Sequence, residues 1–203
     1  MKRFLVTGCP RSGTKYTATL FKSLGVHIGH EKVFGVTEGL GNGAVDWRGR
    51  EGDASWMAVP FLPLDDDIIV LHQLRHPLEF VRSVCGFGFL SDERAELPFP
   101  RVVRLHAPEV YEPDTQPERG ATLWRVWNAK AAPHATITYR LEDLDVAFLM
   151  DLCRLIELDV SEDQAAEALD ALPRNLNQRA RDESVEWERI APIAGEDAAH
   201  YGY

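Results

Sequence analysis

A strand, a glycine-containing loop and a helix follow one another near the N-terminus, and this order constrains the fold more than any other part of the chain. Apolar residues at 4–6 predict a short buried strand that ends at Thr7-Gly8. After Ser12-Gly13-Thr14, positions 17, 20, 21 and 24 have the spacing of one helix face. Such a loop aims backbone N–H groups and the positive end of a helix dipole at one point, where an anion can bind.

Two cationic side chains, Arg11 and Lys15, stand in and just after this loop. An ordinary strand-to-helix turn with two solvated cations would show the same spacing of Gly8 and Gly13, so the glycines alone do not decide between the two interpretations. The added cations favour a site for a phosphate-type anion.

The composition is that of a globular protein and limits the partners. A chain of 203 residues, 45% hydrophobic and 27% charged, can bury the core of one domain, so we predict a single domain over residues 1–203. A formal net charge of −10 argues against general binding to nucleic acid or to a membrane surface. An anionic ligand therefore needs a locally basic pocket within an acidic protein.

The cysteines and the N-terminus bear on the compartment. Cys9, Cys85 and Cys153 are odd in number and scattered, without the spacing of a disulfide framework or a zinc site, and we predict no metal. The first apolar run is too short for a signal peptide, and no segment reaches the ~18–20 apolar residues that cross a bilayer. We therefore expect a cytoplasmic protein without a membrane partner.

Strands and helices alternate along the rest of the chain. The apolar run at 68–71 predicts a strand buried on both faces, and 135–139 has strand propensity. The helices that we predict start at Pro77, cover about 120–132 and 142–157, and start at Ser161, which has capping-box spacing to Gln164. This alternation predicts an α/β fold with three α/β/α layers and a mainly parallel central sheet.

Two segments, 35–64 and 86–119, are predicted to be mainly irregular insertions. The first is rich in glycine and contains Trp47 and Trp56, and the second is rich in proline. The first is either a lid over a substrate or a surface insertion whose Trp56 packs on the core. We expect both insertions to wall an acceptor site, and we assign no element to the tail at 174–203.

A P-loop kinase or triphosphatase is one alternative for the anion loop, and the residues fit it poorly. That loop needs Gly-x-x-x-x-Gly-Lys-Ser/Thr, with the hydroxyl on magnesium. Here Thr14 follows Gly13, and Lys15 comes one place late. The strand at 68–71 leads to His72-Gln73, where a magnesium-binding Asp would be expected.

A cysteine-dependent phosphatase is a second alternative. It needs Cys-x5-Arg, in which a thiolate attacks phosphorus and the arginine clamps the oxygens. Cys9 is followed at this spacing by Lys15, which lacks the bidentate fork of arginine. Cys9 is nevertheless the best rival nucleophile in the sequence.

A third possibility rests on two motifs that resemble those of sulfotransferases using 3′-phosphoadenosine 5′-phosphosulfate (PAPS). Cys9-Pro-Arg-Ser-Gly-Thr-Lys-Tyr16 resembles their 5′-phosphosulfate loop. Leu74-Arg-His-Pro-Leu-Glu-Phe-Val-Arg-Ser83 is similar to their 3′-phosphate motif, with Arg75 at a strand end and Ser83 eight residues later on a helix. Tyr139-Arg-Leu-Glu-Asp-Leu144 resembles, more weakly, the Tyr-Glu-Asp-Leu segment that follows a late strand in the family. The resemblance covers about 4–31, 68–86 and 135–150, and implies a fold of the P-loop nucleoside triphosphate hydrolase type.

The chain departs from the family pattern at several places. Lys15 stands where many members have Thr, and Tyr16 stands where cytosolic members have a Trp that stacks on adenine, which a tyrosine ring can also do. Leu141 replaces a late tyrosine. The late Arg-Lys-Gly motif is absent, and Arg174 or Arg179 is a candidate substitute.

The resemblance implies in-line transfer of a sulfuryl group from PAPS to a hydroxyl or amine, without a metal. Loop N–H groups and cations would hold the 5′-phosphosulfate and stabilise the leaving group, and Arg75 with Ser83 would hold the 3′-phosphate. The donor-binding residues implied in this way are Arg11, Ser12, Gly13, Thr14, Lys15, Tyr16, Arg75 and Ser83.

The acceptor needs a general base, and we expect Glu31 to serve, with Arg11 and Lys15 as the other catalytic groups. A glutamate at a similar distance after the loop arginine is the base in tyrosylprotein and some bacterial sulfotransferases, which this segment resembles. Burial would raise the pKa of Glu31, and Arg11 would lower it. His30 is the alternative base.

The acceptor itself is left open as a small molecule or a sugar. Trp47 and Trp56 hint at a ring-bearing or sugar acceptor, although core packing explains tryptophans more often. A non-catalytic relative that binds an adenosine bisphosphate is a further alternative.

Overall fold

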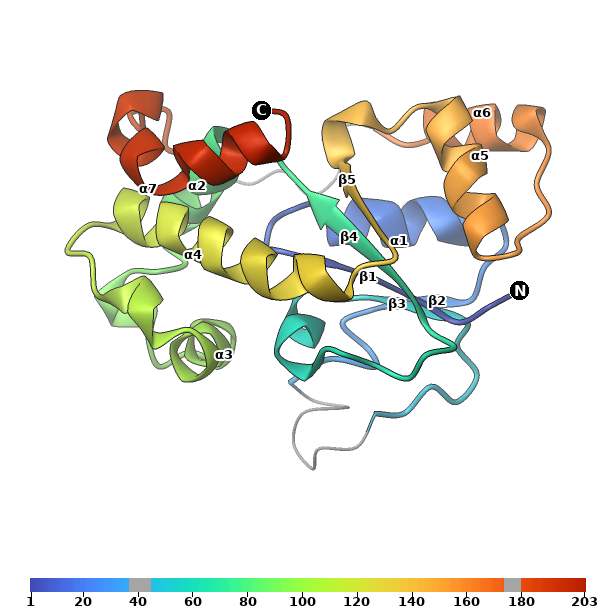
Figure 1. Cartoon of the computed structure of the whole chain (residues 1–203), viewed down its shortest axis with the longest axis horizontal. Coiled ribbons are helices and arrows are strands. Elements are labelled where there is room, and N and C mark those ends of the chain that lie inside the picture. Colours follow the sequence, from blue (N-terminus) through green and yellow to red (C-terminus); the bar gives the residue numbers. More distant parts are fainter. Residues whose placement is uncertain (37–44, 174–179) are drawn as a thin grey trace.

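The structure, a computed structural model, describes residues 1–36, 45–173 and 180–203. A five-stranded sheet with the order β2-β3-β1-β4-β5 lies at its centre (Figure 1). The strands are β1 Phe4–Gly8, β2 Ile28–His30, β3 Gly52–Ala54, β4 Ile69–Leu74 and β5 Ile137–Arg140. Each neighbouring pair in this sheet is parallel, which confirms the predicted α/β class with a parallel central sheet.

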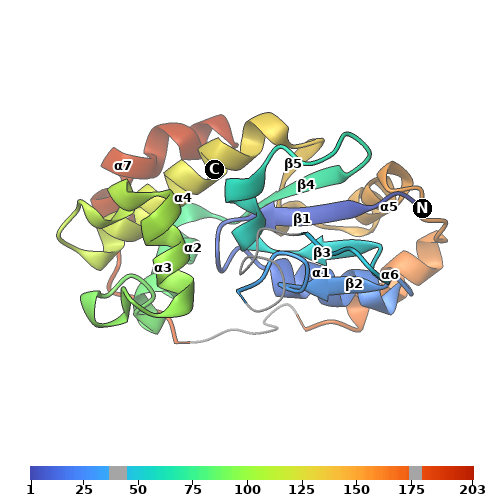
Figure 2. The same cartoon turned by 90° about the horizontal axis from the view of Figure 1, so that it is seen from below.

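Helices cover both faces of the sheet (Figure 2). Those in the described residues are α1 Thr14–Ser23, α2 Pro77–Phe87, α3 Pro98–His106, α4 Gln116–Ala131, α5 Val146–Leu155, α6 Glu162–Asp170 and α7 Trp187–His200. Helices α1, α5 and α6 share one core with the sheet, while α2, α4 and α7 build a second core on the other side. This arrangement agrees with three α/β/α layers. None of the helices in the described residues is long and apolar enough to cross a membrane.

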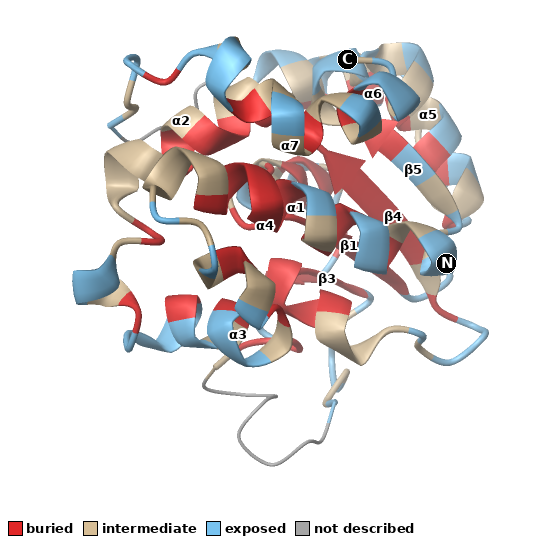
Figure 3. Cartoon of the chain, turned by 60° about the vertical axis from the view of Figure 1, so that its left-hand side comes forward, coloured by how far each residue is buried: buried red, intermediate tan, exposed pale blue. Residues whose placement is uncertain are grey.

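Side chains of β1 contribute to the cores on both sides of the sheet, because successive residues of a strand point to opposite faces. Phe4 and Val6 belong to the core with α1, where the rings of Phe4 and Phe21 lie 5.0 Å apart. Leu5 points the other way, into a small core with Phe34. All five residues of β1 are buried, and Figure 3 shows that the neighbouring strands are largely buried too.

Two predicted helix starts are confirmed. Pro77 occupies the first turn of α2, where its missing N–H leaves no hydrogen bond unmade. Gly88, which we did not predict as a helix end, terminates α2 in the left-handed conformation with φ 63°. The capping box between Ser161 and Gln164 opens α6. The predicted helix at about 120–132 is part of α4, on which Trp124 and Trp127 are fully buried.

The prediction of an irregular segment at 35–64 is wrong for its second half. The three residues of β3, Gly52–Ala54, form an inner strand, and a 3₁₀ helix at Trp56–Phe61 follows. Gly-Asp-Ala has no strand propensity, so this strand depends on its neighbours and on the buried Asp53. Part of the segment, 37–44, lies outside the described residues, as do Arg174 and Arg179.

The prediction of an irregular segment at 86–119 is also wrong. It contains α3 and the first turn of α4, with short 3₁₀ helices at Asp92–Arg94 and Pro108–Tyr111. The prolines misled the prediction because Pro98 and Pro100 lie in the first turn of α3, where proline is tolerated. In the tail we predicted no element, yet α7 forms and buries Ile190, Ala194 and Ala198 at a spacing of four residues.

Candidate functional site

A cavity of about 670 Å³ lies beyond the carboxyl ends of the strands. Residues at the end of each of the five strands, or one or two positions beyond it, line the cavity, which is where open α/β sheets bind ligands. Of the residues predicted to bind the donor or to catalyse, the cavity is lined by Arg11, Gly13, Thr14, Lys15, Tyr16, His30, Glu31, Arg75 and Ser83. Ser12 instead is buried beneath the loop, and its hydroxyl has no hydrogen-bond partner among the described residues.

The loop between β1 and α1 is tightly folded. Gly13, the N-cap of α1, has φ 98°, and a Cβ on it would lie 2.5 Å from Leu141 Cδ2. Arg11 also has a positive φ, 68°, a conformation that stores roughly 1–3 kcal/mol of strain in a residue other than glycine. Both positions turn the chain so that it enters α1 beside the cavity.

A buried glutamine holds this loop from below. Gln73 at the end of β4 donates from Nε2 to the Ser12 carbonyl over 2.7 Å. Its Oε1 accepts hydrogen bonds from the hydroxyls of Tyr139, over 2.7 Å, and of Thr17. The amide is therefore directed into the loop and the core, and as a neutral group it offers no carboxylate for a metal ion at this strand end.

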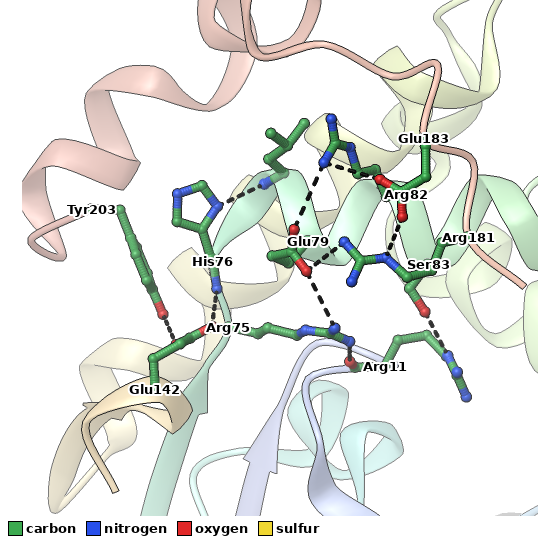
Figure 4. Close-up of polar contacts among 11 residues, drawn as sticks. Arg11, Arg75, His76, Glu79, Arg82, Ser83, Glu142, Arg181, Glu183 and Tyr203 are labelled. Carbon is green, nitrogen blue, oxygen red and sulfur yellow. Dashed lines mark hydrogen bonds and ion pairs between the residues drawn. The ribbon is translucent and has the colours of Figure 1, made fainter. Parts of the chain in front are cut away.

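The two predicted phosphate motifs meet in the structure (Figure 4). Arg11 Nε donates to Ser83 Oγ over 3.1 Å, and Arg75 donates from a terminal nitrogen to the Arg11 carbonyl over 3.0 Å. The carbonyl of Arg75 in turn accepts from the Trp124 indole over 2.9 Å. Residues far apart in the chain thus form one continuous polar wall.

Glu79 lies among three arginines on this wall, and Figure 4 shows Arg75 and Arg181 both pointing at it. Its carboxylate lies 2.5 Å from Arg181 and 3.9 Å from each of Arg75 and Arg82. Burial lowers the pKa of Arg75, and the charge of Glu79 opposes that effect. Around the cavity, Arg11, Lys15, Arg75 and Arg181 stand against Glu31, Glu79 and Glu142, a small excess of positive charge within an acidic protein, as an anion site requires.

Glu31 directly follows β2, the edge strand three places from β4 in the sheet, and lies in a turn that a buried carboxylate organises. Asp53 accepts from the backbone N–H groups of Lys32, Val33 and Phe34 over 3.1–3.2 Å. Glu31 itself has φ 56°, and its N–H donates to the Ala54 carbonyl over 3.1 Å. These contacts fix the backbone from which the Glu31 side chain reaches the cavity.

The environment of Glu31 suits a general base. Burial raises the pKa of its carboxyl group, a hydrogen bond with the Trp56 side chain opposes this rise, and the nearby charge of Asp53 adds to it. We had expected Arg11 to supply the opposing influence, and Trp56 supplies it instead.

His30, the alternative base, is a weaker one. Burial, followed by the charges of Lys15 and Lys22, lowers the pKa of His30 to about 4. Its Nε2 lies 3.3 Å from the Thr14 hydroxyl. The imidazole is therefore neutral near pH 7 and takes up a proton less readily than an exposed histidine.

Cys9 does not lie where a nucleophile would act. It is buried, and its thiol donates weakly to the backbone of α4 and to Asn128 Oδ1 at 3.5 Å. Burial raises its pKa well above the ordinary value, so the thiol stays protonated. This argues against a cysteine-dependent phosphatase.

Sequence reasoning missed several members of this site. Glu79 had a readable signal, because it lies four residues after Arg75 on a helix and charges so spaced interact. Gln73, Asp53 and Arg181 had none, since each acts through a contact that only the fold creates. In the described residues, no cluster of three or more His, Cys, Asp or Glu side chains could hold a metal ion.

No protein-family model matches this chain, and no curated protein matches it either. The function is therefore inferred from the cavity and from the residues around it.

Proposed function

We propose that this protein is a sulfotransferase of the P-loop-like α/β class, which moves a sulfuryl group from PAPS to a hydroxyl or amine. In the same proposal, the protein is cytoplasmic, needs no metal and binds no nucleic acid. One observation carries it: Arg11 and Arg75, which belong to two separate motifs of the resemblance, are joined through Ser83 and the Arg11 carbonyl on the wall of one cavity.

The donor would lie along this wall. N–H groups at the start of α1, with Arg11 and Lys15, would hold the 5′-phosphosulfate at the positive end of the helix dipole. Tyr16, Leu141 and Leu144 offer an apolar slot of the kind that an adenine ring needs. They would contact the adenine ring on the side where Leu141 replaces the late tyrosine of the family.

The 3′-phosphate would bind at Arg75 and Ser83, with Arg181 as a third group. Arg181 lines the cavity and lies beside Glu79, so its guanidinium is already held near Arg75. It could take the role for which we had considered Arg174 or Arg179. A site that reads a 3′-phosphate would favour PAPS over ATP.

In the reaction, the acceptor oxygen or nitrogen forms a bond to sulfur as the bond between sulfur and the bridging oxygen of the 5′-phosphate breaks. Glu31 takes the proton of the acceptor, and 3′-phosphoadenosine 5′-phosphate leaves with the bonding electron pair. Arg11, Lys15 and the N–H groups at the start of α1 stabilise the negative charge that grows on the bridging oxygen. The sulfuryl group carries less charge than a phosphoryl group, so these groups can act without a magnesium ion.

A P-loop kinase-like protein is the second candidate, and Gln73 weighs against it. Its Nε2 is engaged by the Ser12 carbonyl and its Oε1 by two hydroxyls, which leaves a neutral amide where magnesium chemistry needs a carboxylate. A binder of adenosine bisphosphate without turnover would have the same wall, and it differs only in whether Glu31 acts.

Turnover by Glu31→Gln separates the enzyme from the binder. The amide keeps the shape of the side chain and cannot take a proton, so kcat should fall at least 100-fold. Binding of 3′-phosphoadenosine 5′-phosphate should change less than threefold. The measurement is the release of 3′-phosphoadenosine 5′-phosphate from PAPS in the presence of an acceptor alcohol. Equal rates for Glu31→Gln and the wild type would exclude Glu31 as the base.

A further inference from the structure

One face of α2 runs along the cavity and changes character on the way. Glu79, Ser83 and Phe87 follow one another at intervals of four residues, and all three line the cavity. A helix rises 1.5 Å per residue, so this face spans about 12 Å. The cavity is charged at the Glu79 end and aromatic at the Phe87 end.

The aromatic end is completed by rings from the 3₁₀ helix at Trp56–Phe61, from the turn after α2 and from α3. Trp56 lies at the centre of this cluster, with ring centroids 6.0 Å from Phe89 and 6.4 Å from Phe99. Phe99, on α3, is 40% exposed while it lines the cavity, which makes it part of the mouth. Trp47 does not line the cavity and packs against Phe34, so it takes no part here.

Glu31, the proposed general base, lies next to this aromatic end. Its side chain contacts the Trp56 side chain by a hydrogen bond. Arg75 and Arg181 lie beside Glu79 at the charged end of α2, Arg11 contacts Ser83 in the middle of this face, and the donor is proposed to bind along these residues. A group that receives the sulfuryl and is deprotonated by Glu31 must therefore have its own body against the aromatic rings.

We propose that the acceptor is an alcohol or amine carried on an uncharged, apolar body about the size of one ring, and not a sugar. This inference rests on the proposed function. The four aromatic residues at this end offer one side-chain hydrogen-bond donor, the indole N–H of Trp56, and Glu31 already engages it. The several hydroxyl groups of a sugar would lose their water there without replacement partners, whereas an apolar ring loses nothing on leaving water.

The test compares two primary alcohols, 2-phenylethanol and methyl β-D-glucoside, whose reacting groups are alike. Their binding is measured by calorimetry with the protein alone and with the protein in the presence of excess 3′-phosphoadenosine 5′-phosphate, and their sulfation is measured with PAPS. We expect 2-phenylethanol to bind and to react at least tenfold better in kcat/KM. Phe99→Ser should reduce both for 2-phenylethanol at least fivefold, and Leu105→Ser, on the same helix but 73% exposed, should reduce neither.

The outcomes distinguish this inference from the function beneath it. If the protein binds the bisphosphate and sulfates the glucoside as well as or better than 2-phenylethanol, the inference of an apolar acceptor is wrong, while the proposed sulfotransferase function is retained. Failure of 2-phenylethanol to bind, or a Phe99→Ser variant that behaves as the wild type, would overturn it as well. Binding of 2-phenylethanol that depends on Phe99, in a protein that does not bind the bisphosphate, would keep the apolar site and reject the proposed function.

Discussion

The guanidinium Nε of Arg11 donates a hydrogen bond to the Ser83 hydroxyl over 3.1 Å, across 72 residues of chain. Arg11 belongs to the loop before α1, and Ser83 to the second turn of α2. Both residues line the same cavity, so one ligand could touch the groups at either end of this contact. A bisphosphate with anionic groups at two ends of a nucleoside is the kind of ligand that such a pair would bind.

Replacing the serine of this pair should weaken ligand binding more than it weakens the fold. In Ser83→Ala, Arg11 loses the hydrogen bond from its Nε and the 3′-phosphate would lose a donor, so we expect the Kd of 3′-phosphoadenosine 5′-phosphate to rise about 5–10-fold. The free energy of unfolding should change by less than about 1 kcal/mol. Calorimetric titration and urea unfolding measure the two quantities. Ser91→Ala, on the loop after α2, is the control, and equal Kd values for the two variants would contradict a role for Ser83.

Glu79 should orient the arginines of the wall and, at the same time, weaken the binding of anions. Its carboxylate neutralises part of the charge of Arg75 and Arg181 in the free protein and repels a phosphate placed between them. We expect Glu79→Gln to tighten binding of the bisphosphate about 3–10-fold at low salt and to make the affinity more sensitive to salt.

The matched control for this charge is Glu93→Gln. Glu93 lies exposed on the 3₁₀ helix after α2 and does not line the cavity. This variant should bind the bisphosphate as the wild type does. Weaker binding by Glu79→Gln would mean that the carboxylate chiefly orients the arginines, contrary to the expectation.

Gln73→Glu tests the support beneath the anion loop. The carboxylate could still accept from Thr17 and Tyr139, but it has no N–H for the Ser12 carbonyl and would face that oxygen with a negative charge. We expect a loss of roughly 2–4 kcal/mol in the free energy of unfolding at pH 7, and a partial recovery at low pH as the carboxyl protonates and donates. Urea unfolding of the variant and the wild type at pH 5 and pH 7 measures both. A variant as stable as the wild type at pH 7 would show that the loop does not depend on Gln73.

His72 should make the fold less stable in mild acid. Burial lowers its pKa to about 4, against an ordinary value of 6.5, although its hydrogen bond with Asn128 works the other way. Below about pH 6.5 the unfolded chain takes up a proton that the folded chain refuses, so stability from this group is complete above that pH and is lost as pH falls toward 4.

The expected size follows from the shift. Between pH 7 and pH 5 the wild type should lose about 2 kcal/mol more than His72→Gln, which cannot titrate at this position. Urea unfolding at the two pH values gives the difference. The two proteins share the same buried carboxyl groups, so the effect of these groups cancels in the comparison. Equal losses of unfolding free energy in the two proteins would show that the pKa of His72 is not lowered in the fold.

Much of the sheet and its neighbouring helices could be predicted from local patterns. The runs that became β1, β4 and α2 are long or strongly apolar, and Pro77 marks a helix start by its own chemistry. Strand β3 could not be predicted, because Gly52 and Ala54 pair only through β1 and β2 and carry no signal themselves. Helix α7 was missed because its buried face is made mostly of alanine, with Pro192 inside it.

The candidate site likewise contains residues that local patterns predict and residues that only the fold brings in. Arg11, Arg75 and Ser83 could be named because each belongs to a motif within one short segment. That these motifs line one cavity, and that Gln73 and Arg181 join them, depends on the parallel pairing of β1 with β4 and on the tail returning to α2. Contacts of this kind link segments 60 or more residues apart, and no local pattern in one sequence records them.

The most direct test of the proposed function is thermal unfolding with 3′-phosphoadenosine 5′-phosphate and, separately, with ATP plus Mg²⁺. Ligand at 100 times its Kd adds ~2.7 kcal/mol to the free energy of unfolding, which for a chain of this size raises Tm by roughly 5–11 °C. We predict this rise with the bisphosphate alone. It should be lost in Arg75→Ala and kept in Arg101→Ala, whose side chain lies exposed on α3. A rise only with ATP and Mg²⁺, or no rise with either ligand, would contradict the PAPS site.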